Sequence, residues 1–63
     1  MRIDRIKFYT ELLRRSMTQK EFATLSGVSR VTINNVLNGK SCSQATAEKI
    51  AAALNINLSK ITE

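Results

Sequence analysis

The sequence predicts an all-α fold, a compact bundle of about five short helices. Apolar residues recur at helical spacing in successive segments, proline is absent, and turn-forming residues fall in short clusters between those segments. The chain has 63 residues, of which 43% are hydrophobic and 24% are charged, a globular composition. We therefore expect residues 1–63 to form a single domain.

The first helix is expected to occupy roughly a dozen residues after Ile3. It should end near Arg15 and Ser16, where cations suit the negative end of the helix dipole. Two apolar stripes share this segment, Ile6, Tyr9 and Leu13 on one and Phe8 and Leu12 on the other. The pattern does not decide which stripe lies deeper. The aromatic side chains are all expected in the core: Phe8, Tyr9 and Phe22.

A second helix is signalled by Thr18 and Glu21, which have the spacing of a capping box. Its inward face is expected to be Phe22, Ala23 and Leu25. Gly27 should end it, because the chain must pass through a left-handed conformation to turn sharply.

The third helix is expected from Arg30 to about Asn38, with Ser29 as its N-cap and Gly39 after its end. At 100° per residue, one side carries the core stripe of Ile33, Val36 and Leu37. The opposite side carries Val31, Asn34, Asn35 and Asn38, with Arg30 and Thr32 on the flanks.

The fourth helix is expected to begin after Ser43 and to bury Ala47, Ile50, Ala51 and Leu54. Asn55 can supply a left-handed C-cap. Asn57 can cap a last short helix that holds Ile61, and this helix should fray unless something packs on it.

The second and third helices are separated only by Gly27–Ser29, which defines a tight helix-turn-helix. This motif requires a small residue where the helices touch, a residue in the turn that tolerates positive φ, and apolar residues that pack on both sides of the turn. The sequence supplies them as Ala23, Gly27, and the set Phe22, Val28, Ile33 and Val36.

These residues resemble the Cro/phage-repressor (Xre-like) helix-turn-helix family. The matching segments are Gln19–Ala23, Gly27–Ser29, Ile33, Asn38–Lys40, Lys49–Leu54 and Asn55–Leu58. The resemblance implies a lambda-repressor-like DNA-binding domain of five helices, with the third helix in the major groove. The segment 27–39 also resembles lactose-repressor-type headpieces, but those begin almost directly with the motif, and here a full helix precedes it. Two departures are Ser26, at a site the family often fills with an apolar residue, and the link 14–17, which lacks the usual glycine.

The outward face of the third helix suits base recognition. Asparagine is a weak helix former, so an ordinary exposed face would favour Glu, Lys, Gln or Arg. Asparagine can instead bond the major-groove edge of adenine, and an outward valine can meet a thymine methyl group. We interpret Asn34, Asn35 and Val31 as base contacts, against the alternative of an ordinary surface helix. Arg30 could pair with guanine or hold a phosphate.

Other candidate DNA contacts lie around that face. Ser29 and Thr32 are included, although capping alone explains Ser29. The resemblance implies that Gln19 contacts a backbone phosphate, where helix amide groups also suit an anion. Asn38 and Lys40 suit further phosphates, and their competing role is to end the helix. Charges expected to be solvated or to act at long range are Arg2, Arg5, Lys7, Arg14, Arg15, Lys20, Lys49 and Lys60.

The composition argues against several other function classes. No apolar run approaches the roughly 20 residues that span a bilayer, and residues 1–5 lack the apolar core of a signal peptide. One cysteine and no histidine leave no internal disulfide and no plausible zinc site. The carboxylates never form a close pair, and there is no glycine-rich phosphate loop. We therefore expect no catalysis, metal or cofactor, and a reducing, cytoplasmic location on the nucleoid. Cys42 is interpreted as incidental.

The net charge of +5 then indicates an anionic partner. The sequence favours a sequence-specific double-stranded DNA-binding transcriptional regulator of the phage or mobile-element repressor type. It should bind a palindromic operator as a homodimer, through a C-terminal contact at Leu58 and Ile61. The alternative is an antitoxin or adaptor domain that acts mainly through a protein partner. A membrane-surface protein is disfavoured, because the basic residues do not gather on one amphipathic face.

Overall fold

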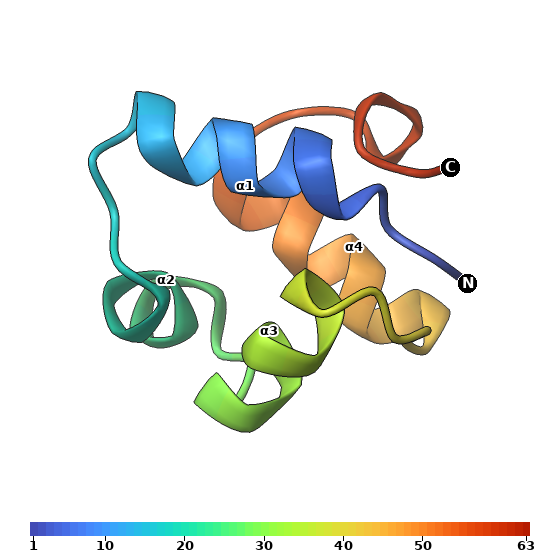
Figure 1. Ribbon diagram of the computed structural model, residues 1–63, viewed down its shortest axis with the longest axis horizontal. Coiled ribbons are helices and arrows are strands. Elements are labelled where there is room, and N and C mark those ends of the chain that lie inside the picture. Colours follow the sequence, from blue (N-terminus) through green and yellow to red (C-terminus); the bar gives the residue numbers. More distant parts are fainter.

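Four α-helices and one turn of 3-10 helix make up the structure, a computed structural model that describes residues 1–63. The elements are α1 (Arg5–Arg14), α2 (Gln19–Ser26), α3 (Arg30–Leu37), α4 (Gln44–Leu54) and η1 (Leu58–Lys60). In Figure 1, α2 and α3 lie together on the side of the molecule away from η1, and both chain ends are on the right. The all-α prediction is confirmed, with the 3-10 turn η1 in the place of a fifth helix.

Each α-helix begins at a residue whose side chain satisfies a free backbone amide. The capping box is present: the Glu21 N–H donates to Thr18 Oγ1 at 3.1 Å, and the Thr18 N–H donates to Glu21 Oε1 at 2.9 Å. Ser29 and Ser43 cap α3 and α4 as expected. Asp4 caps α1 by accepting from two backbone N–H groups, a role that the sequence analysis missed.

The backbone has positive φ at four positions that follow the α-helices, one of which is Gly39, at φ 89° just after α3. Gly27 joins α2 to α3 at φ 75°, and Asn55 ends α4 at φ 58°, both as expected. The fourth is Ser16, at φ 54° in the link between α1 and α2. The left-handed position is therefore kept in this link although the glycine usual in the family is absent.

The core is assembled from all parts of the chain around an aromatic pair. The rings of Phe8 and Phe22 meet edge to face, with centroids 5.3 Å apart. Twelve residues are buried, and they are all hydrophobic: Ile3, Phe8, Leu12, Phe22, Val28, Ile33, Val36, Ala47, Ile50, Ala51, Leu54 and Ile61. Leu37, predicted to share the α3 core stripe, is partly buried against this cluster.

The structure decides between the two apolar stripes of α1. Phe8 and Leu12 are buried, whereas Ile6, Tyr9 and Leu13 are 66%, 53% and 59% exposed. The prediction that all three aromatic residues belong to the core is therefore wrong for Tyr9. Successive helix residues point about 100° apart, so a helix that packs through Phe8 turns its neighbour outward.

Leu25 was also expected to face inward, and this is wrong, because it is 58% exposed. Phe22 is the only fully buried side chain of α2. Ser26, at the family's usual apolar site, is partly buried and bonds locally instead. Its hydroxyl donates to the Ala23 carbonyl at 3.4 Å and accepts from the Val28 N–H at 3.2 Å.

The C-terminal segment is covered by the N-terminal segment. Ile3 pairs with Thr62 in an antiparallel bridge, and the Asp4 N–H donates to the Ile61 carbonyl at 2.6 Å. Ile61 is consequently only 1% exposed, and Leu58 is partly buried against the core. The expectation that both residues stand uncovered as a dimer contact is wrong for Ile61. Asn57 precedes η1 but makes no side-chain cap bond, contrary to prediction.

Arg15 has a specific structural contact, which corrects its assignment to solvent. Its Nη2 donates to the Leu54 carbonyl at 2.8 Å, and its Nη1 pairs with the Glu11 carboxylate. Arg14 also pairs with Glu11, at 2.9 Å. The carbonyls of a last helical turn have no partner within the helix, so this guanidinium fastens the end of α1 to the end of α4.

Candidate nucleic-acid interface

The turn at Gly27–Ser29 presents α3 with one face against the core and the other toward solvent. Val28, buried within the turn, and Ile33 and Val36 anchor the inner face. On the outer face Val31 is 71% exposed, a high value for an aliphatic side chain. No acidic residue lies in α3, so the outer face offers only neutral and cationic groups.

The predicted base contacts have no partners within the chain. The side chains of Arg30, Asn34 and Asn35 make no intramolecular hydrogen bond or ion pair, and the same holds for Gln19, Asn38 and Lys40. Arg30 and Asn34 are exposed, and Asn35 is half-buried. Their donors and acceptors are therefore free for an external ligand.

Ser29 and Thr32 differ from these residues because each has a structural partner. Ser29 Oγ accepts from the Thr32 N–H at 3.2 Å and donates to Thr32 Oγ1 at 2.8 Å. This pair closes the first turn of α3. Capping accounts for both side chains, as expected for Ser29.

The start of α2 and the outer face of α3 meet in one shallow hollow of about 300 Å³. Its lining residues are Gln19, Arg30, Val31 and Asn34. The sequence had placed these residues on two different helices, and the structure brings them together. Asn35, Asn38 and Lys40 lie outside this hollow, Asn38 and Lys40 following the end of α3.

A second hollow of about 290 Å³ adjoins the first and shares Gln19 and Asn34 with it. It also contains Arg5 and Tyr9 of α1, neither of which the sequence placed near DNA-contacting residues. The sequence pattern left open that the stripe with Tyr9 faces outward, since it gave two possible core faces for α1. Only the packing shows which of the two is exposed.

Most acidic groups are engaged in bonds within the chain. Glu11 lies between Arg14 and Arg15, and Glu63 is 3.7 Å from Arg2. The backbone N–H of Thr18 lowers the pKa of Glu21, with a further hydrogen bond from the Thr18 hydroxyl. Glu21 is therefore ionised at neutral pH and engaged in the cap of α2.

The rest of the molecule carries no second obvious chemical centre. No group of three or more His, Cys, Asp or Glu side chains could hold a metal ion. Burial raises the pKa of the Cys42 thiol, which disfavours the reactive thiolate. None of the helices combines the length and the apolar character needed to cross a bilayer.

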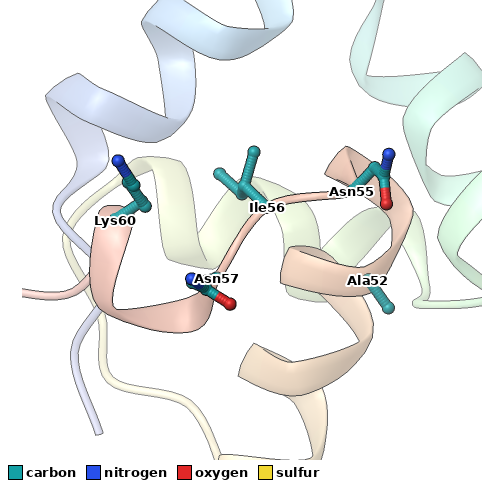
Figure 2. Close-up of a pocket in the computed structure, with 5 residues that line it drawn as sticks. All are labelled: Ala52, Asn55, Ile56, Asn57 and Lys60. Carbon is teal, nitrogen blue, oxygen red and sulfur yellow. The ribbon is translucent and has the colours of Figure 1, made fainter.

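A further depression of about 420 Å³ lies between the end of α4 and η1 (Figure 2). Lys60 is its only charged lining residue, beside the amides of Asn55 and Asn57. No acid–base pair or nucleophile lines it.

Comparisons with known proteins agree with this geometry. The chain aligns over its full length with 14% of the chain of a solved structure described as Phpd with cadmium complexed with hydroethylphosphonate, at 27% identity and a TM-score of 0.84. The chain thus spans about one seventh of the length of that protein. A search of curated proteins gave no match. The profile of the Helix-turn-helix family matches residues 9–61. The chain therefore belongs to the Cro/phage-repressor (Xre-like) helix-turn-helix family, a family of DNA-binding domains.

Proposed function

We propose that the protein is a sequence-specific transcriptional regulator that inserts α3 into the major groove of double-stranded DNA, as a repressor of the phage or mobile-element type. One observation carries the proposal: the outward amides and valine of α3 have no partners within the chain and adjoin the start of α2. An exposed helix face built for solvent alone would not use weak helix formers in this way.

The proposed contacts divide into two classes. Val31, Asn34 and Asn35 contact bases, and Arg30 pairs with guanine or a nearby phosphate. Gln19, Asn38 and Lys40 contact phosphates and set the register, with Ser29 and Thr32 as further contacts at the start of α3. The net charge of +5 steers the protein onto the duplex. We propose that residues 1–63 act as one domain in this role.

The test begins with selection of bound duplexes from a random pool, which should give a palindromic consensus. On the selected site, Asn35→Ala and Arg30→Ala should each lose about 1–3 kcal/mol of binding free energy, and little on random DNA. Asn57→Ala is the matched control, since Asn57 is an exposed amide next to η1, on the side of the molecule away from α3 (Figure 1), and makes no cap bond.

Two results would contradict the proposal. A wild-type protein that selects no consensus would show that it does not recognise sequence. Equal losses on the selected and random duplexes for Asn35→Ala would show that Asn35 does not contact bases, whereas the same result for Arg30→Ala would assign Arg30 to a phosphate.

A specific observation supports the alternative, a domain that acts through a protein partner. Ile6 and Leu13 of α1 are exposed together with Tyr9, whereas Ile61 is buried and unavailable. In the adaptor alternative, Leu13→Ser, at a residue that lies outside both hollows, would abolish function. Changes at Asn34 and Asn35 would leave function intact, the reverse of the outcome expected for DNA recognition.

A further inference from the structure

We propose that α1 is part of the DNA-contacting surface, with Arg5 and Tyr9 binding the sugar-phosphate backbone of the strand that Gln19 contacts. This inference rests on the proposed function and deepens it, because it adds a third element to the footprint of α2 and α3.

The first support is the continuity of the surface. Arg5 and Tyr9 line the same hollow as Gln19, Asn34 and Asn38, and Gln19 and Asn34 also line the hollow that holds Arg30 and Val31. A backbone that lies on Gln19 and Asn38 therefore runs past Arg5 and Tyr9.

The second support is that the two arginines at the joined hollows have no carboxylate partner. Of the five arginines in the sequence, Arg2, Arg14 and Arg15 pair with carboxylates. The two arginines without a carboxylate partner are Arg5 and Arg30, and these are the two that line the joined hollows. A guanidinium without a carboxylate partner is available for bidentate pairing with phosphate.

Arg5 lies beside the end of α3. A methyl group built on Gly39 would lie 3.7 Å from Arg5 Cδ. Arg2 Nη2 donates to the Gly39 carbonyl at 2.9 Å, which holds the start of α1 beside the chain that leaves α3. The guanidinium of Arg5 is thus presented next to Asn38, a proposed phosphate contact.

The chemistry of the lining favours nucleic acid over a protein partner. No carboxylate lines the hollow. Its polar groups are a guanidinium, a phenol and three side-chain amides, all potential donors to phosphate oxygens. The Tyr9 hydroxyl has no hydrogen-bond partner in the chain. The carbon surfaces of Ile6 and Leu37 suit the apolar face of deoxyribose.

The test is the salt dependence of binding to the selected duplex and to random DNA, for wild type and single variants. Arg5→Ala should make the slope of log K against log salt shallower by about 0.9, the value for one phosphate contact. The affinity deficit of this variant should then shrink about three- to fourfold between 50 and 200 mM salt, equally on both DNAs. Arg5→Lys should keep the wild-type slope. Tyr9→Phe should weaken binding severalfold without changing the slope, because it removes a neutral donor.

Lys7→Ala is the matched control, since it removes the same charge from α1 at a residue that lies outside the hollow. Equal slopes for Arg5→Ala and Lys7→Ala would overturn the proposal, because both changes would then act only through net charge. A wild-type slope for Arg5→Ala, or wild-type binding by Tyr9→Phe, would overturn the assignment of that residue. Failure of the wild-type protein to bind duplex DNA would instead refute the proposed function.

Discussion

Ser16 has a backbone conformation that residues other than glycine rarely adopt. Its φ of 54° lies in the left-handed region, and the residue is exposed in the link from α1 to α2. Its N–H donates to the Leu13 carbonyl at 3.1 Å, so the position closes the end of α1. The usual glycine is missing here, yet the left-handed conformation is kept. For a residue other than glycine this conformation costs about 1–2 kcal/mol.

Ser16→Gly should therefore stabilise the protein. Relief of the left-handed strain is partly offset by the larger entropy of glycine in the unfolded chain, so the expected gain is about 0.5–1 kcal/mol. Urea unfolding measures the difference. Ser41→Gly is the control, because Ser41 lies in a loop without positive φ. An equal gain in the two variants would contradict the explanation.

Glu11 couples the stability of the protein to pH. The hydrogen bond from Arg15 has the largest effect and lowers the pKa of Glu11 below its ordinary value of 4.5. Burial opposes this shift, and the charge and hydrogen bond of Arg14 add to it. Because the folded-state pKa is depressed, the pairing stabilises the fold fully above the unfolded pKa. This stabilisation is lost as pH falls from about 4.5 through the folded value.

Glu11→Gln should accordingly flatten the acid side of the stability profile. The wild type should lose more of its free energy of unfolding than the variant as pH falls from about 6 to about 3. The difference between the two proteins should begin near pH 4.5, the ordinary pKa of the carboxyl group. Urea unfolding across that range is the measurement, with Glu48→Gln as a control because Glu48 has no ion-pair partner. Parallel profiles for wild type and Glu11→Gln would show that the pair does not contribute.

At the scale of the elements, helix starts were the most predictable feature because capping is local. Thr18, Ser29 and Ser43 each bond an amide within three residues, so the chain carries that signal without any tertiary contact. The outward face of α3 was equally readable, since its angular position follows from the core stripe of Ile33 and Val36. Most of the candidate site was predictable for this reason.

The buried face of α1 could not be predicted from the sequence of that helix alone. Its two apolar stripes are alternative core faces until α2 and α3 pack against one of them. That packing buries Phe8 and leaves Tyr9 beside Gln19. Arg5 and Tyr9 could not be linked to the site from sequence, because their neighbours come from residues far along the chain.

At the scale of the whole molecule, one small domain offers few base contacts, so we expect homodimers on an inverted repeat. Half-sites about 34 Å apart place two recognition helices on one face of the duplex. Since Ile61 is buried, the remaining apolar groups of the C-terminal face are Ile56 and Leu58, both partly buried. Charge repulsion between two chains of +5 each would make dimers more stable on DNA than free.

Sedimentation with and without the selected duplex tests this expectation. Two chains should bind each duplex, and Leu58→Ser should weaken occupancy of the second half-site about tenfold or less through loss of apolar contact. Leu25→Ser is the control, because Leu25 is an exposed leucine on α2. Monomers both free and on the duplex would contradict the expectation.

The sequence by itself determined the helices, the helix-turn-helix and the face of α3 that leaves the core, because capping, glycine geometry and helical period all act over a few residues. Tertiary structure alone decided which stripe of α1 is buried, that Ile61 lies under the N-terminal segment, and that Arg15 fastens α1 to Leu54. Each of these contacts joins segments about 40 residues or more apart, or depends on which helix arrives to cover a face. Local patterns fix what a segment can bury, and the packing of the other segments selects what it does bury.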